Sequence, residues 1–363
     1  MRSSASQTYK RLVNRARDRT RAEAMALRVR ADVDRQMKML LAGGAARPLP
    51  ERETRRIRDY ARDVFGDARF APWLQFYAVW NGGFREGWVP EDFFQSVAIP
   101  YLNGAYHKLC QARTLQRRLL DTPSMPDIGY FAGGRWFDLS GAPVARGDVA
   151  AMLFAEVDEV CVKAEHTIWG RGVSFETRGG FDIDRVERVG NLAVQRVIRQ
   201  HEWFDPLSPA AVATLRVATG RIEGAAPHLV GSFLRMGAGA SRAIGLESLE
   251  APVVDAEGTL APYAITEDWR RAPRHPDTGA AFAGLRVPEF GRAAAHCLAL
   301  HERLPQFGFI GWDVVLDRAG AVQVMEFNTA HPETKVIEMT VGPCFRDFRL
   351  ERYQGMSRKD VWA

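Results

Sequence analysis

The sequence has only four cysteines, which are scattered along its 363 residues. None of them has the C-x-x-C spacing of a zinc site, and their number does not suggest the disulfide framework of a secreted domain. Long apolar runs are also lacking, since none approaches the ~18 residues that a membrane-spanning helix needs. The basic N-terminus is not followed by an apolar segment and does not resemble a secretory signal. We therefore expect reduced thiols and a cytoplasmic location.

Motifs for covalent catalysis and for simple nucleotide binding are missing as well. The sequence contains no G-x-S-x-G elbow, no H-E-x-x-H pair and no Walker A loop. The segment RMGAGAS has Gly237 and Gly239 after an apolar stretch, but Arg242 stands where a dinucleotide fingerprint needs its third glycine. These absences argue against a covalent enzyme nucleophile and against a Rossmann-type cofactor site.

Positive charge is concentrated at the N-terminus. Residues 1–60 contain 16 Lys and Arg against 7 Asp and Glu, or +9, whereas the whole chain carries +5, which leaves −4 for the remainder. Apolar residues recur at helical spacing in this segment, which predicts a basic amphipathic leading helix. Such a helix suits contact with an anionic membrane surface or an acidic protein, or it is an ordinary helix with a solvated face. No nucleic-acid-binding motif accompanies it, so we do not expect a nucleic acid partner.

The order of the predicted elements indicates an α+β fold. Strands and helices mix after residue 105 without regular βαβ alternation, which is typical of antiparallel sheets with helices beside them. Helices are expected at 107–121, 182–190 and 288–303, and strands or hairpins within 135–144, 159–176, 191–201, 210–219, 227–237 and 309–316. The expected divisions are a helical region at 1–105, two α+β parts at 106–200 and 201–350, and a tail at 351–363.

The segment GWDVVLDRAGAVQVMEFN, residues 311–328, predicts a β-hairpin with Ala319 and Gly320 in its turn. This register places Asp313 directly opposite Glu326, and Asn328 falls on the same face because side chains on one face repeat every second residue. Directly opposed like charges destabilise a hairpin and need an explanation. The other face is a packing surface, formed by Trp312, Val314, Leu316, Met325 and Phe327.

Spacing alone leaves two interpretations of these charges open. Two carboxylates and a carboxamide form an all-oxygen set that suits Mg²⁺ or Mn²⁺, with water and substrate phosphates completing the octahedron. Alternatively, the hairpin is exposed to solvent and its opposed carboxylates are paired with arginines.

Three cationic residues lie in apolar strand patterns. Lys163 precedes a loop with Gly170 and Gly172, whose backbone N–H groups suit a phosphate, although lysines at strand ends are common on surfaces. Arg216 and Arg235 are each flanked by apolar residues, which is typical of an arginine directed at a carboxylate or a phosphate. A structural ion pair is an equal alternative for each arginine.

In chain order, these features resemble the ATP-grasp superfamily. The D-x₁₂-E-x-N pattern of Asp313, Glu326 and Asn328 is similar to the metal motif of that superfamily and to the corresponding stretch of D-alanine–D-alanine ligases. The stretches LSPAAVATLRVAT, FLRMGAGAS, HPDTGAAFAG, LHERLPQFGFIGWDV and VMEFN are similar to the sugar-transfer-associated subgroup. The resemblance covers roughly residues 105–345.

The resemblance implies two α+β lobes with ATP between them, a small lobe at 106–200 and a large lobe at 201–350. Two Mg²⁺ ions, with Mn²⁺ as an alternative, would be held by Asp313, Glu326 and Asn328. Contacts to ATP are implied for Lys163, Gly170, Arg171, Gly172, Gln195, Val197 and, upstream, Lys108. Contacts to the γ-phosphate, an acyl phosphate or the substrate are implied for Arg235 and Arg216.

The sequence departs from the ligases in two places. Gly311 stands two residues before the metal-binding Asp, where those enzymes often carry an arginine, and residues 329–335 read TAHPETK in place of a Pro-Gly loop. Both departures leave the acceptor substrate open.

The implied activity is ATP- and Mg²⁺-dependent joining of a carboxylic acid to an amine through an acyl phosphate. A sugar acid or an amino acid in glycan or natural-product biosynthesis would be the substrate. The alternatives are an ATP-dependent phosphotransferase on the same fold and a non-catalytic ATP-binding regulatory protein. The ligase reaction needs no covalent enzyme nucleophile, in agreement with the missing motifs. The sequence does not identify the acid, the amine or the oligomeric state.

Overall fold

The computed structural model describes residues 30–44, 46–167, 172–222, 224–245 and 248–355. Within these ranges, no helix is both long and apolar enough to cross a membrane. The chain divides into two compact units, Met1–Glu86 and Gly87–Ala363, so residues 87–105 fall in the second unit. The predicted basic helix before residue 30 lies outside the described residues.

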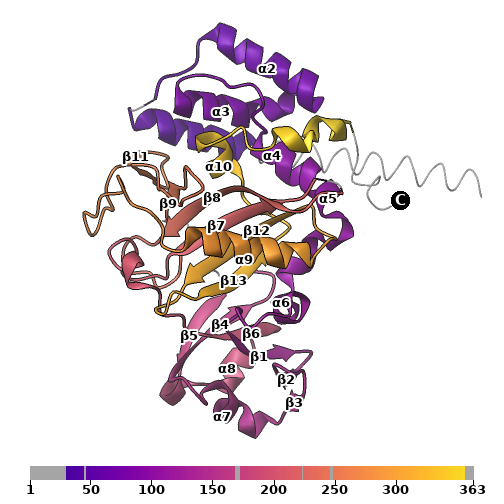
Figure 1. Ribbon diagram of the computed structural model, residues 1–363, viewed down its shortest axis with the longest axis vertical. Helices are drawn as coiled ribbons and strands as arrows, with labels where there is room; N and C mark the ends of the chain where they lie inside the picture. Colours follow the sequence, from indigo (N-terminus) through magenta and orange to yellow (C-terminus); the bar gives the residue numbers. More distant parts are fainter. Residues whose placement is uncertain (1–29, 45, 168–171, 223, 246–247, 356–363) are drawn as a thin grey trace, which may run out of the picture. The chain divides into compact units, whose positions relative to one another are not determined.

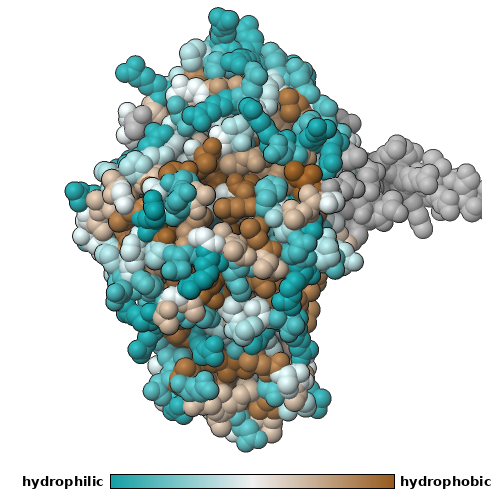
Figure 2. All heavy atoms as spheres, viewed as in Figure 1, coloured by the Kyte–Doolittle hydropathy of each residue, from teal (hydrophilic) through white to brown (hydrophobic). Residues whose placement is uncertain are grey.

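The first unit is helical in its described residues. After a helix at 30–42, its elements are α2 (Glu51–Phe65), the 3-10 turn η1 (Ala68–Phe70) and α3 (Ala71–Asn81). Gly66 ends α2 in a left-handed conformation with φ 81°, which glycine adopts without steric cost. Hydrophilic residues cover α2 (Figure 2), whereas most of α3 is buried and the rings of Trp73 and Phe76 pack edge-on at 5.6 Å. Helices with buried aromatic side chains therefore occur in this part of the chain, within the helical region predicted at 1–105.

Two antiparallel sheets form the body of the second unit (Figure 1). The smaller sheet has the order β3-β2-β1-β6-β4-β5 and the larger one β11-β10-β9-β8-β7-β12-β13. The strands of the smaller sheet are β1 (Asp127–Ala132), β2 (Arg135–Asp138), β3 (Pro143–Val144), β4 (Glu159–Ala164), β5 (Val173–Thr177) and β6 (Leu192–Arg196). Those of the larger sheet are β7 (Thr214–Gly220), β8 (His228–Met236), β9 (Leu249–Pro252), β10 (Ala264–Ile265), β11 (Arg271–Ala272), β12 (Phe309–Leu316) and β13 (Val322–Asn328). These antiparallel sheets confirm the predicted α+β class.

Helices accompany both sheets. They are α4 (Glu91–Phe93), the π-helical turn η2 (Phe94–Ala98), α5 (Ile99–Leu102), α6 (Arg113–Leu120), α7 (Val149–Leu153), α8 (Ile183–Glu187), α9 (Phe290–Glu302) and α10 (Lys335–Thr340). The 3-10 segments are η3 (Gly104–Gln111), η4 (Arg146–Asp148), η5 (Arg178–Gly180), η6 (Glu202–Phe204), η7 (Arg346–Phe348) and η8 (Leu350–Tyr353). The helices predicted at 182–190 and 288–303 are confirmed as α8 and α9. The single helix predicted at 107–121 is wrong, because Ala112, with φ −88° and ψ 77°, separates η3 from α6.

Each sheet has one apolar and one polar face. In the smaller sheet Val160 and Val162 of β4 point into a hydrophobic core, and the alternate residues Cys161 and Lys163 lie on the other face. In the larger sheet the apolar face, which includes Leu215, packs with α9 in a second core (Figure 1). The charged residues of the larger sheet therefore share the remaining face.

A β-bulge adjusts the register of the predicted hairpin. Next to the turn Leu316 pairs with Val322, which is one residue out of the predicted register, but Asp313 pairs with Glu326 as predicted. The register shifts between these pairs because Met325 is an extra residue in β13. Our assignment of Met325 to the packing face is therefore wrong, since the core contains Val324 and Phe327 but not Met325.

A buried histidine ties α9 to the larger sheet and makes stability depend on pH. His301 contacts the Thr219 hydroxyl at 2.7 Å and the Phe307 carbonyl at 2.9 Å, and burial lowers its pKa to about 4. A lowered folded-state pKa means that the stabilisation is present above the unfolded pKa near 6.5 and is lost as the pH falls towards 4.

We expect His301→Gln to show less acid destabilisation than the wild type. Between pH 7.5 and 5 the wild type should lose about 2 kcal/mol of unfolding free energy through His301, in addition to the contribution of other groups. Urea unfolding of both proteins at the two pH values measures the difference. Equal losses in both proteins would contradict this role for His301.

Candidate active site

The three predicted metal ligands lie together on the polar face of the larger sheet. Asp313 of β12 is paired with Glu326 of β13, and the Asn328 side-chain amide donates a hydrogen bond to Asp313 at 3.2 Å. Asp313 is only 6% exposed, which excludes the interpretation of a solvent-exposed hairpin. The structure thus brings two carboxylates and a carboxamide to one place, as the spacing predicted.

Each carboxylate is also paired with an arginine. Arg216, directly across from Asp313 on β7, binds both its oxygens, at 2.6 Å through Nε and 3.1 Å through Nη2. Arg113, at the start of α6, forms an ion pair with Glu326 and donates to the Thr167 carbonyl at 3.3 Å. Burial raises the pKa of Glu326, but Arg113 and Lys163 outweigh it and hold the pKa well below its usual range. Glu326 is therefore held ionised in a largely buried position.

The missing arginine before Asp313 has a steric explanation. A Cβ atom at Gly311 would meet the backbone oxygen and the Cβ of Pro332 at 3.1 Å, so the following loop occupies this space. Arg216 donates to the Pro332 carbonyl at 2.7 Å. A guanidinium from the neighbouring strand thus lies beside Asp313, whereas a side chain at position 311 would require the loop at Pro332 to shift.

The smaller sheet directs two predicted ATP ligands towards the same hairpin. The Lys163 ammonium lies 3.5 Å from the Met325 carbonyl, and the Gln195 side-chain amide lies 3.4 Å from the same oxygen. Both side chains are buried, at 6% and 4% exposure. The bulge at Met325, which sequence analysis missed, is therefore where the polar faces of the two sheets meet.

The remaining predicted ATP ligands are less well connected. Gly172 has φ 75°, a conformation that favours glycine, and Val197 is half-buried just after β6. Lys108 is exposed on η3. Gly170 and Arg171 lie outside the described residues.

Arg235 lies on the polar face of the larger sheet, in a cluster of alternating charges. It donates to Glu333 at 2.6 Å and to Glu250 of β9 at 3.1 Å, while Lys335 is 2.9 Å from Glu333. Burial would lower the pKa of Arg235, but these carboxylates outweigh it and keep the guanidinium charged. Glu333 and Lys335 belong to the TAHPETK segment, so the segment that departs from the ligases is the one that closes this cluster.

The site also contains four charged residues that we did not predict from the sequence: Arg113, Glu250, Glu333 and Lys335. Arg113 lies five positions after Lys108, beyond the break at Ala112, and it is Arg113 that pairs with Glu326. Glu250 could have been found from its place in the short apolar strand SLEAPVV. Glu333 has φ 53°, a backbone conformation that no feature of the sequence signals.

The three oxygen-bearing side chains of the hairpin do not form a complete metal site by themselves. Among the residues that the structure describes, no three His, Cys, Asp or Glu side chains gather as a metal site. Asp313, Glu326 and Asn328 supply three oxygen-bearing side chains, a set that fits Mg²⁺ when phosphate oxygens and water complete its coordination. We therefore expect the ion and a nucleotide to bind together.

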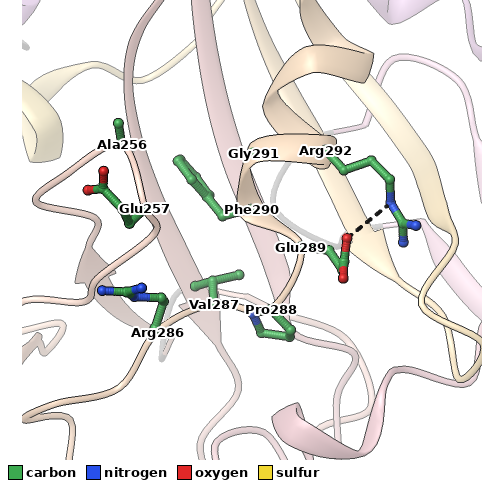
Figure 3. Close-up of a pocket in the computed structure, with 9 residues that line it drawn as sticks. All are labelled: Ala256, Glu257, Arg286, Val287, Pro288, Glu289, Phe290, Gly291 and Arg292. Atoms are coloured by element: carbon green, nitrogen blue, oxygen red, sulfur yellow. Dashed lines mark ion pairs between the residues drawn. The ribbon is translucent and has the colours of Figure 1, made fainter.

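A surface pocket of about 510 Å³ lies elsewhere, at the start of α9 (Figure 3). Residues 286–292 form most of its lining, and Glu289 pairs with Arg292 at 3.6 Å. None of the predicted site residues lines it, so we do not assign the active site to this pocket.

Residues 184–352 match the family described as sugar-transfer associated ATP-grasp. This part of the chain, a little under half of its length, is therefore similar to the ATP-grasp superfamily. The matched range contains Gln195, Arg216, Arg235 and the whole hairpin formed by residues 311–328. The ATP-grasp superfamily consists mostly of ligases, and its members in general bind ATP or ADP and Mg²⁺.

Solved ATP-grasp structures are among the matches to the fold. The ATP-grasp ligase PsnB matches with 12% identity and a TM-score of 0.41, covering 70% of this chain and 64% of that one. D-alanine–D-alanine ligase from Coxiella burnetii matches with 14% identity, a TM-score of 0.40 and coverage of 72% and 62%. Biotin carboxylase from Campylobacter jejuni matches with 10% identity, a TM-score of 0.43 and coverage of 71% and 50%. The chain spans less than two thirds of each of these proteins, and no curated protein matches it.

Proposed function

We propose that this ATP-grasp protein is an ATP- and Mg²⁺-dependent carboxylate–amine ligase. The observation that carries the proposal is the pairing of Asp313 with Glu326 beside Asn328, directly opposite the buried Lys163 and Gln195 of the other sheet. A carboxylate pair, a lysine and a buried amide at the meeting of two polar sheet faces suit a metal-bound triphosphate. The match of residues 184–352 to an ATP-grasp family supports the same interpretation.

The chemistry requires activation of a carboxylate, because its negative charge repels a nucleophile. The acid oxygen attacks the γ-phosphorus of ATP, the bond to the ADP oxygen breaks, and an acyl phosphate forms. The amine then attacks the acyl carbon, phosphate leaves, and the amine loses a proton. Mg²⁺, when bound, would neutralise charge on the transferring phosphoryl group.

The described residues have distinct parts in this scheme. Asp313, Glu326 and Asn328 would hold the metal, and Lys163 would contact the phosphates. Arg216 orients Asp313 through its two-point contact. Because the register places Arg235 on the same sheet face as Asp313, Arg235 would bind the acid substrate or its acyl phosphate.

The charged cluster around Arg235 indicates which class of substrate the site suits. It combines two cations, Arg235 and Lys335, with the carboxylates of Glu250 and Glu333. Such a cluster can exchange its internal ion pairs for a small polar acid and an amine, which fits an amino acid or a sugar acid better than an apolar one. This substrate class is part of our proposal.

A screen of acid and amine pairs tests the function. Purified protein with ATP and Mg²⁺ should release phosphate only when a competent acid is present, and the product mass should equal acid plus amine minus water. ADP with a phosphorylated product, unchanged by any amine, would indicate a phosphotransferase instead. Absence of ATP turnover together with intact ATP binding would favour a regulatory protein.

We also expect Arg113, and not Lys108, to contribute to nucleotide binding. Arg113→Met should weaken MgADP binding about tenfold, because a charge-assisted contact beside Glu326 is lost. The matched variant Lys108→Met removes an exposed charge from η3 and should change the Kd less than about twofold. Calorimetric titration of both variants measures this, and the reverse ranking would restore the upstream lysine of the sequence analysis.

A further inference from the structure

Asp127, the first residue of β1, is a buried carboxylate without a partner. It is 2% exposed, and neither of its side-chain oxygens has a hydrogen-bond partner among the described residues. Buried polar groups in folded proteins are nearly always hydrogen-bonded, because leaving one unpaired costs free energy. An unpaired pair of carboxylate oxygens therefore needs an explanation outside the local structure.

A second β-bulge determines where Asp127 points. In the pairing of β1 with β6, Asp127 opposes Gln195 and Gly129 opposes Val194, so Ile128 is the extra residue. Asp127 consequently shares the sheet face of Gln195, which in turn pairs with Cys161 of β4. Lys163 is on this same face, two residues further along β4, so Asp127 belongs to the face that meets the metal hairpin.

The cations near Asp127 are directed elsewhere. Burial raises the pKa of Asp127 to about 6, against the opposing effect of Lys163, Arg117 and the nearby side-chain amide of Gln195. The Lys163 ammonium has the Met325 carbonyl as its contact at 3.5 Å, and Arg117 donates to the Met125 carbonyl at 2.5 Å. Neither reaches Asp127 with a hydrogen bond, so its oxygens remain acceptors on the sheet face that they share with Gln195.

The arrangement separates two ends of a bound nucleotide. Charge suited to phosphates comes from Lys163, Arg113 and the hairpin of β12 and β13. Hydrogen-bonding groups come from Asp127 and Gln195, which are paired near the end of β6. An ionised carboxylate only accepts hydrogen bonds. The ligand group that it suits is therefore an N–H donor on an uncharged ring, such as the exocyclic amine of a base.

We propose that Asp127 accepts a hydrogen bond from the 6-amino group of the purine base and so selects ATP over 6-oxopurine nucleotides. The inference rests on the proposed function, because it takes the phosphates to lie beside Lys163 and Glu326. A 6-oxo group is itself an acceptor and would face the carboxylate oxygen without a proton between them; the N1–H of a 6-oxopurine could reach that oxygen only if the ring shifted from the position that adenine takes. Discrimination follows from this mismatch rather than from the shape of the site.

Binding of ATP and inosine triphosphate to the full chain tests the proposal. The two ligands have the same ribose and phosphates and differ in the purine at position 6 and in protonation of the adjacent N1. With Mg²⁺ present, the wild type should bind ATP at least about tenfold more tightly than inosine triphosphate. Asp127→Asn should reduce this ratio about tenfold, because its amide can donate to the 6-oxo group. Asp148→Asn, an exposed carboxylate in the same part of the chain, should leave the ratio unchanged.

The alternative is that Asp127 is only a counter-ion of Lys163 and Arg117. In that case Asp127→Asn would weaken both nucleotides equally, and the unchanged ratio would overturn the proposal. Without nucleotide, our account expects Asp127→Asn to melt no lower than the wild type, since it removes an unpaired buried charge. A second variant, Asp127→Val, should lose affinity for ATP without gaining any for inosine triphosphate. If both variants fail to fold, the residue is structural and the proposal is wrong.

Failure of the inference can be told apart from failure of the proposed function. A wild type that binds neither nucleotide contradicts the ligase proposal and this inference together. A wild type that binds both nucleotides with equal affinity contradicts the inference alone.

Discussion

Glu326→Gln is expected to lower the rate of ATP turnover about a hundredfold or more, because a metal-bound carboxylate is replaced by a neutral amide. Glu326 is held ionised by Arg113 and Lys163, so the wild-type group is ready to bind a cation across the working pH range. Asp313→Asn should have an effect of the same size. Phosphate release with the best acid and amine pair, at saturating ATP and varied Mg²⁺, measures both losses.

The reason for the loss can be separated from unfolding. The Mg²⁺ concentration for half-maximal rate should rise in both variants. The melting temperature should stay near that of the wild type in Glu326→Gln, whereas Asp313→Asn leaves the buried Arg216 without its counter-ion and should melt lower. The control Glu257→Gln, which changes an exposed carboxylate, should retain full turnover. Unchanged turnover in Glu326→Gln and Asp313→Asn would show that the hairpin does not bind the metal.

Arg216→Met is expected to lower the unfolding free energy by about 3 kcal/mol, because it leaves Asp313 charged in a buried position. The side chains of the pair are only 5% and 8% exposed, so water cannot replace the guanidinium. Methionine keeps much of the side-chain volume, which limits the cavity contribution. Urea unfolding without nucleotide measures the loss.

A double-mutant cycle identifies the cause of this destabilisation. Adding Asp313→Asn to Arg216→Met removes the unpaired charge and should recover about half of the lost stability, although not the turnover. Equal stability of Arg216→Met and the wild type would indicate that the two-point contact with Asp313 contributes nothing to folding.

The pairing of Asp313 with Glu326 could be predicted from the sequence, but only because two errors in the assumed register cancel. The assumed register is wrong by one residue near the turn, where Leu316 pairs with Val322, and the bulge at Met325 restores it at Asp313. A bulge depends on how a strand meets its neighbours, so local spacing does not reveal it. For this reason Met325 was assigned to the wrong face of the hairpin. The contacts of its carbonyl with Lys163 and Gln195 could not be predicted either.

The arginine partners of the two hairpin carboxylates could not be predicted. Arg216 and Asp313 are separated by almost a hundred positions, and only the antiparallel pairing of β7 with β12 puts them opposite each other. Apolar flanks marked Arg216 as buried but left phosphate and carboxylate partners equally open. The break at Ala112 lies between Lys108 and Arg113, and no glycine or proline announces it in the sequence.

The most direct test of the account is a calorimetric titration of the wild type with ATP, with and without Mg²⁺. The hairpin has two carboxylates that are each paired with an arginine, so the ion alone should bind weakly and ATP should complete its coordination. We predict ATP binding that is at least about tenfold tighter with Mg²⁺ than with a chelator, together with weak binding of Mg²⁺ alone. No ATP binding, or equal binding with Mg²⁺ and with the chelator, would contradict the assignment of Asp313, Glu326 and Asn328 as the metal site.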